Sequence, residues 1–260
     1  MKILFLNVYQ GIPEPEREEQ IRAFLKRENP DVCGLAELNG WEKNTRFASF
    51  AQKAGFPYHL LSLSSQSSYH VGLLAKYPLE RKALAGSFRN AALAARIVLP
   101  EKKITAIVLH LHPRSEDDRL SELQNILTPD PHHYHHSTLL LGDFNALSPE
   151  DEYPPEMLSL LKNKGITKFG ISSLRKEVIQ KTREAGFVDT ARHFSPLFTP
   201  TAPTHFITDP AHALPCRLDY IFCTEDLVPF LKAASTLRTP ETNMLSDHYP
   251  VRAELSFHNS

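Results

Sequence analysis

The spacing of apolar runs constrains the fold of this 260-residue chain more than any other feature. At the start, residues 3–8 and 29–38 have the pattern of strands, and residues 13–29 and 41–54 have helical spacing of apolar side chains. Between residues 57 and 112, strand-like runs follow one another with only short polar turns between them. Helical connections produce parallel strand pairs and short turns produce antiparallel hairpins, so the sequence predicts mixed sheets.

The hairpin region contains five such runs, at residues 57–63, 70–79, 83–88, 91–100 and 103–112. Further helices are expected at residues 115–127, 155–162 and 172–185, and further strands at residues 137–146, 216–224, 230–237 and 249–257. This order fits two mixed sheets packed face to face with helices outside, in the α/β (α+β) class, better than a doubly wound sheet. No repeat or composition break divides the chain, so one domain over residues 1–260 is expected. Residues 189–215, with five prolines, are expected to form a surface loop.

Composition restricts the partners and the compartment. The net charge is −1, from 29 Lys and Arg against 30 Asp and Glu, so no global basic field favours nucleic acid. The N-terminus has no signal-peptide pattern, and no apolar run reaches the roughly 18 residues of a membrane span. Three cysteines are too few for a disulfide framework. We therefore expect a monomeric cytoplasmic protein without stable membrane insertion.

Polar residues interrupt or follow the apolar runs at the points where the predicted strands end. They are Asn7, Glu37, His110, His112, Asp143, Asn145, Asp219, Ser246, Asp247 and His248. Gly142, just before Asp143, is expected to let the chain turn tightly at the end of its strand.

Each of these residues, taken singly, also has a purely structural explanation. Asn7 could belong to a turn, Glu37 could lie at a helix N-terminus, and Asp143 with Asn145 could form an Asx-turn. His110 could pack in the core, Asp219 could form a salt bridge with Arg217, and residues 246–248 could cap a helix. Together, however, they bring several carboxylates to the ends of neighbouring strands, and burying carboxylates without partners is costly. A cation would offset their repulsion, and oxygen ligands without cysteine pairs suit Mg²⁺, Mn²⁺ or Ca²⁺. This set of residues is what metal-assisted phosphoryl transfer to water requires.

The motifs "LNV", "LAEL", "HVGLLAKYPL", "VLHLH", "GDFNA", "RLDYIF" and "SDHYPV" carry a resemblance that covers nearly the whole chain. In this order they resemble the endonuclease/exonuclease/phosphatase superfamily of metal-dependent phosphoesterases. That superfamily includes DNase I-like nucleases, AP endonucleases, inositol-polyphosphate 5-phosphatases and neutral sphingomyelinases. The resemblance implies a DNase I-like four-layer α-β-β-α sandwich.

The resemblance also implies roles for the matching residues. Glu37 would be the main Mg²⁺ ligand, with Asn7 and Asp247 near the metal. Asp143 and Asn145 would orient the attacking water and a phosphate oxygen.

Three further catalytic roles follow from the same resemblance. His248 would be the general base or polarise the phosphate, and Asp219 would hold its ring in one tautomer. His110 would donate to a phosphate oxygen or to the leaving group. Thr204, in "PTH", would contact phosphate, and Arg119 would face the site unless it is a solvated helix charge.

Two departures separate this chain from particular branches. The DNase I-like branch pairs its equivalent of His110 with a glutamate, where Tyr69 and His70 stand here. The AP endonuclease branch carries a tyrosine at the position of His110, which disfavours that branch. The histidines between His132 and His136 fit an exposed loop.

The sequence therefore predicts a Mg²⁺- or Mn²⁺-dependent phosphodiesterase or nuclease that cleaves a P–O bond by in-line attack of water. A phosphomonoesterase acting on a phosphorylated small molecule or lipid headgroup is the first alternative. A catalytically idle member that keeps the fold for binding is the second. The loop sequences contain no pattern that identifies the phosphoester substrate.

Overall fold

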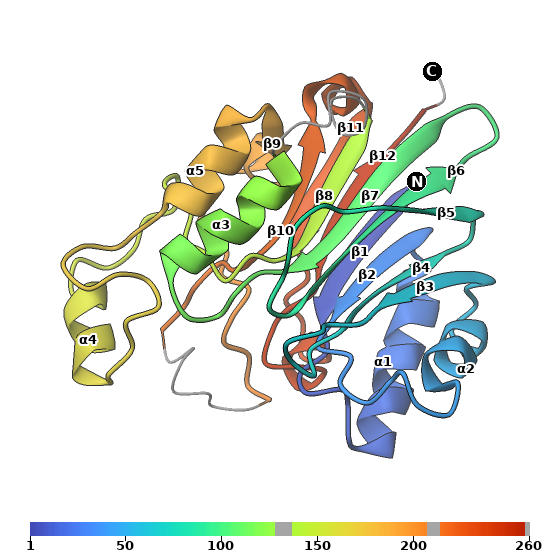
Figure 1. Ribbon diagram of the computed structural model, residues 1–260, viewed down its shortest axis with the longest axis horizontal. Helices are drawn as coiled ribbons and strands as arrows, with labels where there is room; N and C mark the ends of the chain where they lie inside the picture. The colour runs from blue at the N-terminus through green and yellow to red at the C-terminus, as the bar shows by residue number, and fades with distance from the viewer. Residues whose placement is uncertain (128–136, 207–213, 258–260) are drawn as a thin grey trace.

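The computed structural model describes residues 1–127, 137–206 and 214–257, and its centre is a pair of six-stranded sheets packed face to face (Figure 1). The first sheet has the order β11-β12-β1-β2-β4-β3 and the second β5-β6-β7-β8-β10-β9. In the first, β1 and β2 are parallel, and in the second, β7 and β8 are parallel, while the other pairs are antiparallel. The predicted mixed sheets are confirmed.

The strand bounds follow. In the first sheet they are β1 (Lys2–Asn7), β2 (Val32–Ala36), β3 (Tyr58–Ser62), β4 (Val71–Ala75), β11 (Leu231–Thr236) and β12 (Val251–Leu255). In the second they are β5 (Leu79–Lys82), β6 (Ala91–Val98), β7 (Lys103–His110), β8 (Thr138–Asp143), β9 (Phe187–Asp189) and β10 (Asp219–Thr224).

Helices cover the outer face of each sheet (Figure 1). The first sheet carries α1 (Pro15–Glu28) and α2 (Arg46–Lys53), and the second carries α3 (Glu116–Leu127) and α5 (Glu177–Glu184). Two shorter helices, α4 (Met157–Asn163) and α6 (Thr190–Phe194), and two 3₁₀ turns, Glu225–Phe230 and Thr242–Met244, complete the described elements. The expected α-β-β-α sandwich of the DNase I-like class is therefore confirmed. No helix among the described residues combines the length and apolarity that crossing a bilayer demands.

Three apolar layers explain why the central strands are hydrophobic at nearly every position. On β1, Ile3 and Phe5 pack between the sheets, whereas Leu4 and Leu6 pack beneath the helices of the first sheet. On β8, Leu140 packs toward the helices of the second sheet, while its neighbours in sequence face the other sheet. A strand buried on both faces needs apolar side chains on both faces, so it loses the usual alternation.

Two of the predicted strands are wrong, and the first is the run at residues 70–79, which serves both sheets. Its first half forms β4 and its last residue begins β5. Pro78 between them lacks the N–H that would continue a ladder, and the chain crosses there from one sheet to the other. Residues 83–88, expected as a strand, contain none. The backbone of Gly86 there is left-handed, with φ +77°, and passes so close to Asn125 that a Cβ would not fit.

The expected surface loop at residues 189–215 is wrong in part. Asp189 ends β9, and its side chain accepts hydrogen bonds from two backbone N–H groups of α6, which begins at the next residue. Ala202 is buried and forms a β-bridge with Cys216. Residues 207–213 lie outside the described residues, as do His132–His136.

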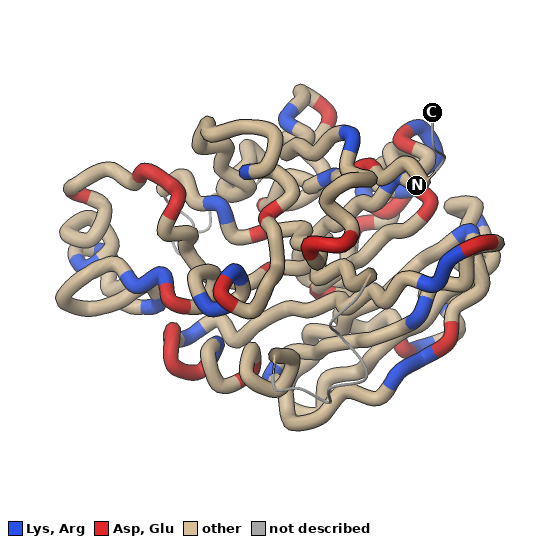
Figure 2. Tube along the Cα trace, turned by 90° about the horizontal axis from the view of Figure 1, so that it is seen from above, with Lys and Arg blue, Asp and Glu red and all other residues tan. Residues whose placement is uncertain are grey.

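Charged residues of both signs are interspersed along the chain, in keeping with its near-zero net charge (Figure 2). The three cysteines are free and buried, as their small number predicted.

Gly142 is required for a different reason from the one expected. It lies inside β8 rather than in a turn, and a Cβ at this position would stand 2.1 Å from the carbonyl oxygen of Leu109 on β7. The glycine therefore lets two parallel strands approach closely just before their polar ends.

Replacing Gly142 by alanine should force β7 and β8 apart and cost about 3 kcal/mol of unfolding free energy, the upper range for overpacking. Urea denaturation measures this loss. Gly165→Ala is the matched control, because a Cβ there meets no atom within 4 Å and only the left-handed backbone opposes it. Equal costs for the two variants would contradict the role assigned to Gly142.

Candidate active site

Strand register brings the predicted polar residues to one edge of the sandwich. The parallel register of β7 and β8 places His110 beside Asp143, and the antiparallel register of β8 and β10 places Asp219 on the other side of Asp143. On the first sheet, Asn7 at the end of β1 pairs with the last residue of β2, and Glu37 follows directly. The ends of five strands thus converge.

Asn7 links the two sheets at this edge. Its Nδ2 donates to Oε1 of Glu37 and to Oδ2 of Asp143, both at 3.1 Å, and its Oδ1 accepts from the backbone N–H of Tyr9 at 3.0 Å. The side chain is buried, so these bonds form away from competing water. A neutral amide therefore lies between carboxylates that belong to different sheets.

Asp143 forms the Asx-turn considered for it and also contacts the neighbouring polar residues, while its role in orienting water stays a prediction. Its Oδ1 accepts from the backbone N–H of Asn145 at 2.8 Å, which is an Asx-turn. Its Oδ2 is directed toward Asn7 and lies 3.6 Å from Nε2 of His110. Asn145 donates from Nδ2 to the carbonyl of Leu111 at 3.1 Å, which fixes its amide beside the site.

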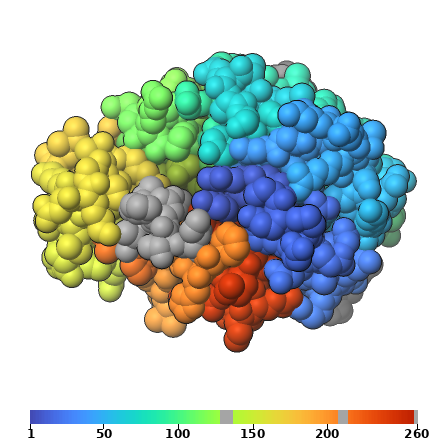
Figure 3. Space-filling view, turned by 90° about the horizontal axis from the view of Figure 1, so that it is seen from below, coloured from blue at the N-terminus to red at the C-terminus, as the bar shows by residue number. Residues whose placement is uncertain are grey.

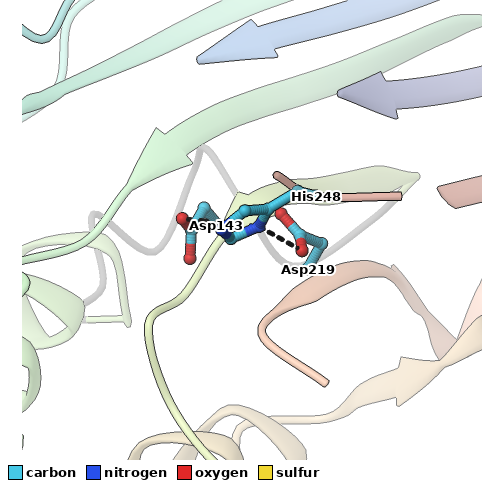
Figure 4. A group of neighbouring side chains, drawn as sticks. All are labelled: Asp143, Asp219 and His248. Atoms are coloured by element: carbon cyan, nitrogen blue, oxygen red, sulfur yellow. Dashed lines mark hydrogen bonds and ion pairs between the residues drawn. The ribbon is translucent and has the colours of Figure 1, made fainter. Parts of the chain in front are cut away.

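His248 and Asp219 form a buried pair (Figure 4). Nδ1 of His248 lies 2.7 Å from Oδ2 of Asp219. Since a carboxylate only accepts, Nδ1 carries the proton, and Nε2 lies on the side of Asp247, at 4.0 Å from Oδ2. Arg217, the alternative partner of Asp219, turns away to Asp151 and Asp189, so that expected alternative is wrong.

The pKa values of both members of the pair are raised. Burial alone would lower the pKa of His248, but the carboxylates of Asp219, Asp247 and Asp143 outweigh it and hold this pKa well above its usual range. Burial raises the pKa of Asp219 to about 6, against the opposing effect of the imidazolium. Perturbed groups of this kind concentrate at catalytic sites.

Glu37 is the partly exposed carboxylate of the group. Its Oε2 accepts from the backbone N–H of Gln10 at 2.8 Å. Burial raises the pKa of Glu37, His110 opposes this rise, and the negative charge of Asp247 adds to it. Glu37 and Asp247 therefore repel each other across the site, which a cation would relieve.

The backbone around the site is strained. Tyr9, Gln10, Glu37 and Asn145 all have positive φ, between 49° and 61°, although none is a glycine. Such conformations cost of order 1–3 kcal/mol each and persist where surrounding contacts enforce them, often at functional sites. Here the bonds from Asn7, Glu37 and Asp143 supply those contacts.

The donor set fits a divalent metal ion. Asp143, Asp219 and His248 can each offer a ligand atom, with these atoms within 4.8 Å of one another (Figure 4). Glu37 and Asp247 add two further carboxylates at the same edge. Carboxylate-rich sets of this kind suit hard cations, so the residues could hold one.

His110 lies beside Tyr69 rather than beside an acid from the same strand region. The two rings meet edge to face, with centroids 5.9 Å apart, and Nδ1 of His110 has no hydrogen-bond partner among the described residues. His70 pairs with Glu42 at 3.2 Å instead. Besides Asp143, Glu122 of α3 adds negative charge near His110, and it accepts from two backbone N–H groups at 2.6 and 2.7 Å. The helical pattern of residues 115–127 gave no signal for this placement.

Arg119 does not take the expected position. Its side chain is fully buried and binds Glu116 at 2.9 Å and the backbone carbonyls of His112 and Lys168. It therefore fastens loops of the second sheet to α3, and the geometry supports neither a substrate contact nor a solvated charge.

Thr204 lies beside the site but uses its polar groups internally. Its hydroxyl donates to the carbonyl of Ser246, and its backbone N–H donates to the carbonyl of Asp247 at 3.1 Å. It holds the segment that carries Asp247 and His248, and its expected contact with phosphate stays a prediction.

The family model for the endonuclease/exonuclease/phosphatase family matches residues 4–248, nearly the whole chain. The chain belongs to this family. Membership implies a hydrolase that acts on phosphoester bonds. No curated protein matches the sequence.

Solved structures of this family share the fold at low sequence identity. An AP endonuclease from Archaeoglobus fulgidus is 21% identical with a TM-score of 0.75, and 98% of this chain and 99% of that one are covered. A 3′ phosphatase from Neisseria, bound to a product DNA hairpin, is 21% identical with a TM-score of 0.73, covering 99% and 100%. An AP endonuclease from Leishmania major is 15% identical with a TM-score of 0.66, covering 97% and 86%.

The His248–Asp219 pair provides a test of the site of this family member. Asp219→Asn removes the charge that raises the pKa of His248 and weakens the hold on its tautomer, so phosphoester hydrolysis should fall about 10²- to 10⁴-fold. The imidazole pKa, followed by NMR, should also fall, because a carboxylate favours the protonated ring.

Asp117→Asn is the control for this experiment, since Asp117 is an exposed carboxylate paired with Arg175. It should leave both the rate and the imidazole pKa unchanged. A wild-type rate in Asp219→Asn would remove this pair from the mechanism.

Proposed function

We propose that this chain is a Mg²⁺- or Mn²⁺-dependent phosphodiesterase, most plainly a nuclease, that cleaves a P–O bond by in-line attack of water. The observation that carries the proposal is the meeting of three further carboxylates with a buried His–Asp pair at one edge of both sheets. Phosphoryl transfer demands positive charge and fixed donors around the phosphate, because negative charge spreads over its oxygens in the transition state.

Glu37 is proposed as the main metal ligand, with Asp247 close by. Glu37 is partly exposed and faces the charge of Asp247, whereas Asp219 and His248 already satisfy each other at 2.7 Å. Asn7 lies near the proposed metal, directs its Nδ2 at two carboxylates and so orients them. The bound cation would supply Lewis-acid stabilisation of the phosphoryl oxygens.

The remaining side chains supply proton transfer and orientation. His248, held by Asp219 through Nδ1, presents Nε2 to the attacking water or to a phosphate oxygen. Asp143 and Asn145, locked together by the Asx-turn, are proposed to orient that water. His110, with Nε2 near Asp143, is proposed to donate to the leaving group or to a phosphate oxygen.

The structural relatives support a nucleic acid as the substrate. The AP endonucleases and the DNA-bound 3′ phosphatase share the fold over almost the whole chain. A phosphomonoester of a small molecule is the second candidate, and the net charge of −1 favours it because no global basic field draws a polyanion. A monomeric, cytoplasmic enzyme remains a prediction.

Loss of the Glu37 carboxylate should abolish turnover. Glu37→Gln should reduce hydrolysis of bis(p-nitrophenyl) phosphate with Mg²⁺ or Mn²⁺ by at least about 100-fold. Glu80→Gln, a half-exposed carboxylate on β5, is the control and should match the wild type. Full activity of Glu37→Gln would overturn the metal assignment, and absence of wild-type turnover on any phosphoester would favour the idle binding member.

Metal binding can be measured without activity. Mn²⁺ at 100 times its Kd should stabilise the wild type by about 2.7 kcal/mol, because a ligand that binds only the folded state at free concentration c adds RT ln(1 + c/Kd) to the free energy of unfolding. The melting temperature should rise with Mn²⁺, return after EDTA, and respond much less in Glu37→Gln. An equal response in the variant would place the ion elsewhere.

A further inference from the structure

Two aromatic residues are tied to the proposed metal pocket by main-chain hydrogen bonds. Tyr9 lies two residues after Asn7, and its N–H donates to Oδ1 of that side chain at 3.0 Å. Phe206 lies two residues after Thr204, and its N–H donates to the threonine hydroxyl at 3.1 Å. Because Thr204 is itself bonded to the backbone of Asp247, both aromatic residues are anchored beside the carboxylates.

The two rings form a pair at the surface of the molecule. Their centroids are 6.0 Å apart with an interplanar angle of 75°, and both side chains are partly exposed. Figure 3 shows the face concerned, where the dark-blue segment after β1 lies next to the orange and red segments that precede β10 and β12.

The guanidinium of a buried arginine, Arg17, packs against both rings. The guanidinium of Arg17 lies 4.9 Å from the ring centroid of Phe206 and 6.0 Å from that of Tyr9. It also donates to the carbonyls of Val8, Tyr9 and Leu245 and pairs with Glu14 at 2.8 Å. The cation thereby joins the turn after β1 to the segment that precedes Asp247, and the rings rest on a rigid base.

The backbone that presents Tyr9 is strained. Tyr9 and Gln10 have φ of 55° and 50°, and Glu37 holds the second of them through the N–H of Gln10. A relaxed turn would carry glycine or asparagine at such positions. Non-glycine residues persist in such conformations where the surrounding contacts enforce them, and here the Glu37 carboxylate is one such contact.

We propose that Tyr9 and Phe206 form a stacking subsite for a planar ring that the substrate carries next to its reacting phosphate. A nucleobase is a ring of this kind. Every base has a π-face, so stacking on aromatic side chains binds a nucleotide without selecting its sequence. It also needs no basic surface, which suits a chain of net charge −1. This inference rests on the proposed phosphodiesterase function and gives it a substrate class.

The test compares two phosphodiesters that differ in the planar group, thymidylyl-thymidine and bis(glycerol) phosphate, under the same Mn²⁺ concentration. In Phe206→Leu, the ratio of kcat/KM for the dinucleotide to that for the glycerol diester should fall about tenfold, the typical value of one stacked base. Tyr9→Leu should act in the same direction. Phe206→Trp keeps a π-face and should restore the ratio.

Phe194→Leu is the matched control, because Phe194 is an exposed phenylalanine on α6 whose ring packs against His193. It should leave the ratio and both rates unchanged. A ratio in Phe206→Leu equal to that of the wild type would overturn the stacking subsite even though the enzyme still turns over both diesters.

A binding measurement separates this inference from the proposed reaction. In Phe206→Trp, thymidine 5′-monophosphate should quench the tryptophan fluorescence and glycerol 3-phosphate should not, whether or not the protein hydrolyses any ester. Folding of each variant is checked by its melting temperature. Equal quenching by the two phosphates would contradict stacking, whereas failure of the metal and turnover experiments would overturn the phosphodiesterase function alone.

Discussion

The amide of Asn7 is the contact on which the geometry of the site depends. It donates to one carboxylate from each sheet, Glu37 beside β2 and Asp143 at the end of β8. Two carboxylates facing each other without a donor would repel, and the two sheets would lose their alignment at this edge. Because β1 lies in the middle of its sheet, the apolar layers on both of its faces hold the amide in place.

Buried arginines complete the support behind the site. Arg217 binds Asp151 and Asp189, Arg119 binds Glu116, and Arg17 holds the turn after β1. Each guanidinium fastens a loop to the scaffold by several donors in a fixed geometry. Because these arginines are paired with other acids, Asp219 is available to bind His248. The carboxylates of the pocket are therefore not neutralised by these arginines.

Much of the fold could be predicted from the sequence, because the period of apolar residues reports burial directly. The hairpin pattern predicted antiparallel strands, and the predicted helices lie in the outer layers. The failures have local causes: Pro78 divides one apolar run between two sheets, and Gly86 bends the chain where a strand was expected. Apolar pattern alone does not say to which of two sheets a strand belongs. The irregular segment around Ala202 was also expected on the surface, yet its bridge to Cys216 buries it.

The sequence by itself determined which chemical groups stand at the strand ends, since the motifs around Glu37, Asp143, Asp219 and His248 are local. Only the tertiary structure decided which group meets which. Packing of the two sheets set Asp219 against His248 rather than Arg217 and brought Glu37 and Asp143 to one amide. The approach of β7 to β8 demanded a glycine at position 142. These pairings join residues far apart in the chain, and their distances depend on the register and packing of whole sheets.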